Sequence, residues 1–161
     1  MKTILSVWNS SSKGKTETIR ELAKLLLSTY PAFTPVKPSS VHIPKKGDFI
    51  LVIDINGIIV GIVSQGDPGT GLKAKLEDLI DTYQCDIIIC ATRTRGDTVE
   101  TVKKMAWQKK YDVIRTSTYQ VSQDHRGLAN QLKARHLLSL LQGLELLPTL
   151  EAQSIAVPSP A

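Results

Sequence analysis

Aromatic residues are scarce in this chain, and long apolar runs are missing. Phe, Trp and Tyr together make up 5% of its 161 residues, which leaves little for the stacking platforms that bind single-stranded nucleic acids. No apolar run approaches the roughly 20 residues that a membrane-spanning helix needs. The first residues, Met1 to Ile4, enter a predicted strand directly, without the apolar stretch of a signal peptide. We therefore expect a cytoplasmic protein with no membrane association and no strong indication of nucleic-acid binding.

Cysteine and histidine are also few. The two cysteines, Cys85 and Cys90, flank a predicted buried strand, which favours free, reduced core thiols over a disulfide. The three histidines, His42, His125 and His136, show no metal-ligand spacing. No Gly-x-Ser-x-Gly motif and no Cys/His pairing indicates hydrolase chemistry of another kind.

The remaining composition is that of an ordinary globular domain. Hydrophobic residues make up 42% of the chain and charged residues 22%, and this length is enough to bury a substantial core. The net charge of +5 suits a polyanionic ligand, either a nucleotide or a nucleic acid, without deciding between them. We predict a single domain over residues 1–147 and a mobile, proline-containing tail over residues 148–161.

Hydrophobic periodicity predicts strands and helices in alternation. The expected strands span residues 3–8, 49–55, 58–64, 86–91 and 112–115, and the expected helices span residues 16–30, 72–83, 97–109 and 126–141. Residues 31–44 carry several prolines and are expected to form a surface loop. The dipeptide Asn56-Gly57 is typical of a type I′ turn, so the strands on either side of it should be antiparallel. The pattern predicts an α/β fold with helices packed on a mainly parallel sheet that contains one antiparallel hairpin strand.

The segment from Trp8 to Thr16 has the composition of an anion-binding loop. It follows the first predicted strand, contains small polar residues, and ends where the first helix begins. Backbone N–H groups of such a loop and of the helix N-terminus point at one spot, and a lysine beside that spot adds a positive charge. The segment resembles the phosphate-binding loop of P-loop NTPases, G-x-x-x-x-G-K-[ST], at Gly14, Lys15 and Thr16, with Asn9 in place of the first glycine.

This resemblance implies a three-layer P-loop-type sandwich and a set of ligand roles. The residues that would cradle the phosphates of ATP, or of another nucleoside triphosphate, are Asn9, Ser10, Ser11, Ser12, Lys13, Gly14, Lys15 and Thr16. Lys15 would bridge the outer phosphates, and the hydroxyl of Thr16 would bind Mg²⁺. Without the resemblance, Lys13 to Lys15 would be interpreted as a solvated basic turn before a helix.

Two aspartates are candidates for the acidic partner of the Mg²⁺ ion. Asp54 ends an apolar strand, as the acidic residue of a Walker B element does, but it lies beside the Asn56-Gly57 turn. If the second hairpin strand points toward the phosphate loop, that turn lies at the far end of the sheet. Geometry then favours Asp67, and Asp54 becomes a residue that stabilises the turn.

Arginines follow the strand predicted over residues 86–91. Arg93 or Arg95 could stabilise a transferring phosphate, and Arg93 is favoured because it lies nearer the strand end. The alternative is a surface ion pair with Asp97 or Glu100.

Three functions remain open at this point. The first is NTP hydrolysis or phosphoryl transfer with Mg²⁺, with Lys15, Asp67 and Arg93 as catalytic candidates. The second is a binding module that holds a nucleotide or another phosphorylated ligand without turnover. The third is an interaction domain in which Lys15 only decorates the surface. A guanine-specificity Asn-Lys-x-Asp segment is missing, which argues against an ordinary GTPase. The phosphate acceptor, any protein partner and the oligomeric state are not indicated.

Overall fold

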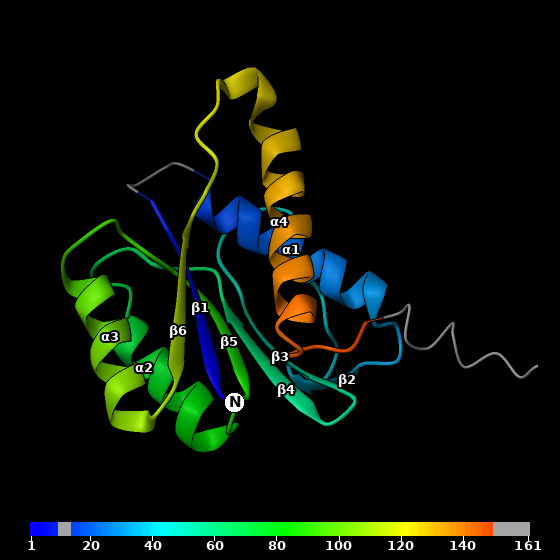
Figure 1. The fold of residues 1–161 in the computed structure, drawn as a ribbon, viewed down its shortest axis with the longest axis vertical. Coiled ribbons are helices and arrows are strands. Elements are labelled where there is room, and N and C mark those ends of the chain that lie inside the picture. The colour runs from blue at the N-terminus through cyan, green and yellow to red at the C-terminus, as the bar shows by residue number, and fades with distance from the viewer. Residues whose placement is uncertain (10–13, 150–161) are drawn as a thin grey trace, which may run out of the picture.

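The protein is built around a six-stranded sheet. In a computed structural model that describes residues 1–9 and 14–149, the strands lie in the order β2-β3-β4-β5-β1-β6 (Figure 1). Their bounds are β1 Thr3–Trp8, β2 Thr34–Lys37, β3 Ile50–Ile55, β4 Ile58–Val63, β5 Ile87–Thr92 and β6 Asp112–Ser117. β1 is parallel to β5 and β6, and β4 is parallel to β5, whereas β3 runs antiparallel to β2 and to β4. The predicted α/β class and the antiparallel hairpin strand are confirmed.

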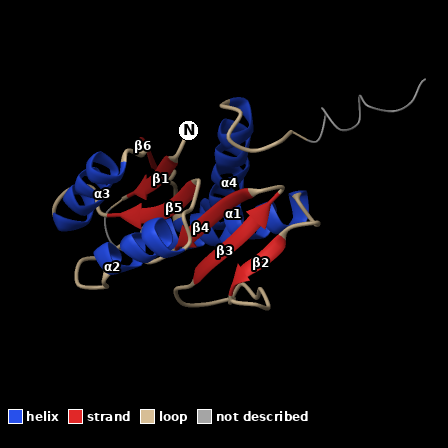
Figure 2. Cartoon of the chain, turned by 90° about the horizontal axis from the view of Figure 1, so that it is seen from below, coloured by secondary structure: helices blue, strands red, loops and turns tan. Residues whose placement is uncertain are grey.

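Helices cover both faces of the sheet. They are α1 Lys15–Thr29, α2 Leu72–Glu77, α3 Asp97–Lys109 and α4 Arg126–Gly143, with a π-helical turn at Asp78–Thr82 and a 3₁₀ turn at Gln123–His125. α1 and α4 lie together on one side, and α2 and α3 on the other (Figures 1 and 2). The helix predicted over residues 72–83 therefore changes to π geometry after Glu77.

The two sheet faces bury separate hydrophobic clusters. Along β5, Ile87 and Ile89 pack into the cluster that contains α1 and α4, whereas Ile88 and Cys90 pack into the cluster that contains α2 and α3. Successive side chains of a strand point to opposite faces. A strand covered on both faces therefore has to be apolar throughout, which explains why β5 was readable from the sequence.

The segment expected to be a loop over residues 31–44 contains a strand, so that prediction was wrong. Thr34–Lys37 forms β2 at the edge of the sheet, antiparallel to β3, with an irregularity between Pro35 and Lys37. β2 is mostly exposed. It therefore lacks the alternating apolar pattern of a half-buried strand, and a proline is tolerated because an edge strand leaves one side unpaired.

The hairpin between β3 and β4 has the predicted turn. Asn56 and Gly57 both have positive φ, 52° and 88°, as a type I′ turn requires. The N–H of Gly57 donates to Oδ1 of Asp54 at 2.6 Å. Since β4 runs parallel to β5 and β1, this turn and Asp54 lie at the amino ends of those strands.

The thiols and the chain end complete the fold. Cys85 and Cys90 are buried and free, as predicted.

Tyr30, at the end of α1, donates its hydroxyl proton to the carbonyl of Pro148 at 2.5 Å, so the chain still contacts the domain where the tail was expected to begin. The rest of that expected tail, residues 150–161, lies outside the described residues. No helix within the described ranges is long and apolar enough to cross a membrane.

Candidate functional site

The carboxyl ends of β1, β4, β5 and β6 open on one edge of the sheet. These strands are parallel to one another, so the loops that follow them emerge on the same side. The loop after β1 leads into α1. Lys15, the first residue of α1, contacts Asp67 in the loop after β4, and Asn9 contacts Thr92 at the end of β5 and Thr118 after β6. The predicted cradle residues Ser10, Ser11, Ser12 and Lys13 lie outside the described part of the chain. The site is therefore described from Asn9 and from Gly14 onward.

Gly14 occupies a position where another residue would be strained. It is the N-cap of α1 with φ 86°, in the left-handed region, and its carbonyl accepts the N–H of Thr18 at 2.9 Å. A Cβ at this position would lie 3.0 Å from Oδ1 of Asn130 in α4. The same Asn130 oxygen accepts the hydroxyl proton of Thr18 at 3.2 Å. Glycine is thus favoured by the left-handed backbone conformation, and any other residue would also crowd the Asn130 side chain.

Two cationic side chains meet at one carboxylate oxygen. Lys15 Nζ lies 3.3 Å from Oδ1 of Asp67, and Arg93 Nε donates to the same oxygen at 2.8 Å. The side chain of Lys15 is 7% exposed, that of Arg93 36% and that of Asp67 50%. The structure therefore brings together the three residues predicted as catalytic, from the start of α1 and from the loops after β4 and β5. Arg93 pairs with Asp67, not with Asp97 or Glu100, the alternative considered from the sequence.

The charges at this point shift the ionisation of both partners. Burial lowers the pKa of Lys15, an effect that the Asp67 carboxylate opposes and that Arg93 reinforces. Partial burial of Asp67 by itself raises its pKa. The hydrogen bond from Arg93 and the charge of Lys15 outweigh that effect and hold the pKa below its ordinary value. Asp67 therefore acts as a built-in counter-anion for two cations.

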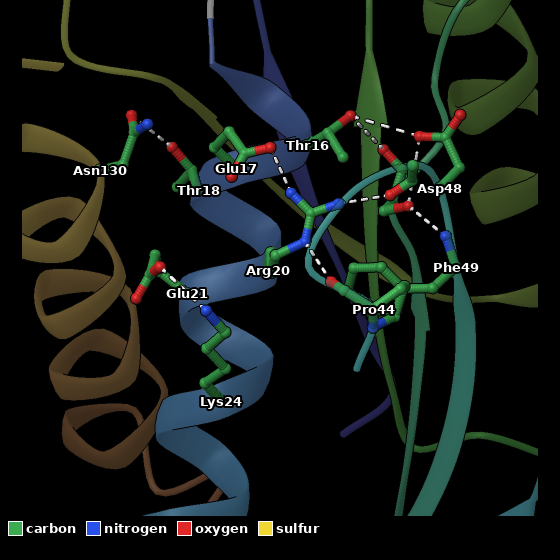
Figure 3. Close-up of polar contacts among 12 residues, drawn as sticks. Thr16, Glu17, Thr18, Arg20, Glu21, Lys24, Pro44, Asp48, Phe49 and Asn130 are labelled. Atoms are coloured by element: carbon green, nitrogen blue, oxygen red, sulfur yellow. Dashed lines mark hydrogen bonds and ion pairs between the residues drawn. The ribbon is translucent and has the colours of Figure 1, made fainter. Parts of the chain in front are cut away.

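Thr16 contacts a carboxylate that sequence reasoning missed. Its hydroxyl lies 3.4 Å from Oδ1 of Asp48 and 3.4 Å from the carbonyl oxygen of Ser64 (Figure 3). Asp48 precedes β3, and β3 is antiparallel to β4, so its start lies at the same edge as the end of β4. The Asn-Gly turn was the signal that could have found this residue, since a hairpin returns the start of its first strand to the end of its second.

Asn9, which stands where the P-loop pattern has its first glycine, is buried and hydrogen-bonded. It is 2% exposed, and its Nδ2 donates to Oγ1 of Thr118 at 2.6 Å. Its backbone N–H reaches the carbonyl of Thr92 at 3.3 Å. Asn9 thus ties the start of the loop to the ends of β5 and β6. Thr118 follows β6, and no local pattern of residues indicates that it pairs with Asn9.

Other candidates from the sequence lie elsewhere. Asp54 lies at the opposite edge of the sheet and bonds its own turn, in agreement with the structural role considered for it. Glu100, proposed as an alternative partner of the arginines, lies 3.7 Å from Lys103 in its own helix. Within residues 1–9 and 14–149 no group of three or more His, Cys, Asp or Glu side chains is arranged to hold a metal ion.

No protein-family model, no curated protein and no solved structure matches this chain.

Proposed function

We propose that this protein binds a nucleotide, ATP or another nucleoside triphosphate with Mg²⁺, in a P-loop-type three-layer fold, and that it hydrolyses the nucleotide or transfers its terminal phosphoryl group. The observation that carries the proposal is the convergence of Lys15 Nζ and Arg93 Nε on a single oxygen of Asp67. This convergence lies beside the N-terminus of α1, whose unpaired N–H groups add partial positive charge.

The convergence supports phosphate binding because both cations are placed for an anion. A lysine that is 7% exposed loses most of its hydration, so it needs an anionic partner to stay charged. In the absence of ligand that partner is Asp67, which is half-exposed and can give way to a phosphate oxygen. Charge placed in advance where negative charge develops is the main way that phosphoryl transfer is accelerated.

The side chains divide between two subsites. One subsite would hold the phosphates of a nucleoside triphosphate, and the other would hold its Mg²⁺ ion. Lys15 would contact the outer phosphates, and Arg93 would stabilise the phosphoryl group in transfer. The hydroxyl of Thr16 would bind Mg²⁺, which neutralises charge on the phosphate oxygens when bound. Hydroxyl and carboxylate oxygens are the ligands that Mg²⁺ prefers, and Thr16 has a carboxylate within 3.4 Å. Asp67 stays a predicted cation ligand, for which it would have to turn away from Lys15.

One observation favours a second function, the binding module without turnover. Asp67 is held by both cations, so it is engaged as a counter-ion and is not free to orient a water or a cation. A protein with this arrangement can exchange Asp67 for a phosphate and stop there. We place either function in the cytoplasm.

Nucleotide titration by calorimetry tests binding. Wild-type protein should bind ATP with Mg²⁺, and Lys15→Ala should weaken binding at least about tenfold, because a charge-assisted contact to phosphate contributes roughly 1.5–3 kcal/mol. Lys24→Ala is the matched control. Lys24 lies in the same helix and pairs with Glu21 at 3.4 Å on an exposed face, so its removal should leave affinity unchanged. If wild-type protein bound neither ATP nor any other nucleoside triphosphate, nucleotide binding would be refuted, with or without turnover.

Phosphate release separates the enzyme from the binding module. If the protein is an enzyme, release should require Mg²⁺, and Arg93→Ala should slow it much more than it weakens binding, since Arg93 would act on charge that develops in the transition state. ATP binding without any phosphate release, in the presence of Mg²⁺, would favour the binding module.

A further inference from the structure

Arg20 is a buried charge in the middle of α1. It is 1% exposed and belongs to the largest fully buried side chains of the protein. A guanidinium ion is costly to bury unless its N–H groups are bonded, and apolar side chains of similar volume often stabilise a buried position at least as well. A fully buried arginine at this position therefore points to a task other than general stability.

The partners of Arg20 come from one short segment before β3. Nε donates to the carbonyl of Pro44 at 2.8 Å, and another guanidinium nitrogen donates to the carbonyl of Gly47. The remaining terminal nitrogen bonds Glu17, one turn earlier in α1 (Figure 3). Residues 45–47 form a bend without regular structure, and Gly47 has φ 84°. The planar fork of Arg20 thus holds both ends of this bend against the first turns of α1.

The residue that follows this bend is Asp48. Its Oδ1 lies 3.4 Å from the hydroxyl of Thr16 and 3.4 Å from the hydroxyl of Ser64. On its other side, the N–H of Phe49 donates to Oγ of Ser64 at 2.7 Å, and the Arg20 guanidinium lies 6.0 Å from the centre of the Phe49 ring. Asp48 is itself exposed. Its place beside Thr16 therefore depends on the buried contacts that flank it.

We propose that Asp48 is the acidic residue of the cation subsite, and that Arg20 is a positioning residue that keeps Asp48 beside Thr16. The inference rests on the proposed function and makes it more specific. Three oxygens converge here, the Thr16 hydroxyl, the Asp48 carboxylate and the Ser64 carbonyl, and all three are hard ligands suited to Mg²⁺. Asp67, held by Lys15 and Arg93, then belongs to the phosphate subsite.

The test compares nucleotide affinity with and without the cation. ATP binding is measured by calorimetry in excess Mg²⁺ and again in EDTA, for wild-type protein and for Asp48→Asn, Arg20→Lys and the double variant. Asp48→Asn, an exposed and nearly isosteric change, should lower the Mg²⁺-dependent gain in affinity about tenfold or more and leave affinity in EDTA within about twofold. Asparagine removes the carboxylate charge, and carboxylate oxygens are the ligands that Mg²⁺ prefers.

Arg20→Lys keeps the charge but loses the planar fork. It should reduce the same Mg²⁺-dependent gain, and Arg20→Lys combined with Asp48→Asn should be no worse than Asp48→Asn alone, because the arginine acts through the aspartate. A merely structural role would weaken binding equally in Mg²⁺ and in EDTA. Lys24→Ala, one turn further along α1, should change neither value.

The outcomes separate this inference from the proposed function. If wild-type protein binds ATP and Asp48→Asn keeps the full Mg²⁺-dependent gain, Asp48 is not the acidic residue of the cation subsite, although the protein still binds nucleotide. If Asp48→Asn loses the gain and Arg20→Lys keeps it, the positioning role of Arg20 is wrong. If wild-type protein binds neither ATP nor any other nucleoside triphosphate, the proposed function and this inference both fall.

Discussion

Lys15 carries its charge in a place that little water reaches. Its side chain is 7% exposed, and burial lowers its pKa from the ordinary value of 10.5. The folded protein therefore binds this proton less tightly than the unfolded chain does, which destabilises the folded state at neutral pH. Such a cost is typical of residues retained for a ligand and not for stability.

Lys15→Met should therefore raise stability while it removes nucleotide binding. Methionine fills a similar volume without a charge to desolvate, and Asp67 is half-exposed and keeps Arg93. We expect the free energy of unfolding at pH 7, measured by denaturant titration, to rise by about 1 kcal/mol. The difference in unfolding free energy between variant and wild type should shrink as pH rises from the folded-state pKa of Lys15 toward 10.5. In that range the unfolded wild-type chain holds the Lys15 proton more tightly than the folded protein does, so each rise in pH favours the folded wild-type protein. A variant that is less stable at pH 7 would show that the Lys15–Asp67 pair outweighs the burial of the charge.

At the scale of elements, the hairpin of β3 and β4 decides which carboxylates face the site. Because β3 is reversed, its end carries Asp54 to the far edge of the sheet, and its start carries Asp48 to the edge that holds Thr16. An apolar strand followed by an aspartate is therefore misleading in this chain. The pattern is present, but β3 runs antiparallel to β4, so its aspartate lies at the end of the sheet opposite to Thr16.

Asp54→Ala should affect stability alone. It removes the acceptor for the N–H of Gly57 at an exposed turn, which we expect to cost about 1 kcal/mol of unfolding free energy. ATP affinity by calorimetry should stay within about twofold of wild type, a range that corresponds to well under 1 kcal/mol. Asp67→Ala, at the other edge, should change ATP affinity. If Asp54→Ala abolished Mg²⁺-dependent binding instead, our assignment of the two sheet edges would be wrong.

The loop after β4 depends on a close approach to β5. A Cβ on Gly66 would lie 2.1 Å from the carbonyl oxygen of Ala91, and a backbone atom of a buried strand cannot move aside. Gly66→Ala should therefore displace the loop that carries Asp67, lower the unfolding free energy by about 1–3 kcal/mol and weaken ATP binding.

Gly127→Ala is the matched control for this loop. Gly127 lies in α4 with no atom within 4 Å of an added Cβ, so alanine there should be neutral or should stabilise the helix by up to about 1 kcal/mol. Thermal melting and calorimetry measure both variants. Equal effects of the two substitutions would show that the contact with Ala91 does not position the loop.

At the scale of the whole molecule, the site lies at the carboxyl ends of the most protected strands. β1 and β5 are buried on both faces, whereas the edge strands β2 and β6 are largely exposed. Arg93 follows β5 directly, and Lys15 is the first residue of α1, the helix that comes after β1. The two cations are therefore supported by rigid neighbours, and the Pro44–Gly47 bend, which joins the site from outside, depends on Arg20.

Hydrogen exchange should show this gradient. Backbone amides of β1 and β5 should exchange on the order of 100-fold more slowly than those of β2 and β6, because central strands open only in larger unfolding events and edges fray locally. Native-state exchange followed by mass spectrometry or NMR measures the rates. Similar rates in central and edge strands would mean that the sheet opens as one unit.

Much of this architecture was readable from residue patterns. The strands within residues 3–8 and 86–91 are mostly apolar, the Asn56-Gly57 turn demands positive φ, and the spacing of apolar residues marks the helices. Each of these signals is local, since it depends on backbone conformation and on burial within one element. Lys15, Asp67 and Arg93 were separate candidates from the sequence, in segments that parallel strands deliver to one edge of the sheet. That their side chains meet at one oxygen comes from the structure.

The tertiary structure alone decided the rest. β2 escaped prediction because an exposed edge strand owes its form to pairing with β3 and not to an apolar pattern. The pairing of Asn9 with Thr118, and the approach of Asp48 to Thr16 under the hold of Arg20, join residues far apart in the chain. Such contacts depend on which strands become neighbours and in which direction each one runs, and no local pattern of residues encodes that. The sequence therefore determined where the cations of the site would gather, and the packing of the sheet determined which carboxylate meets which of its partners.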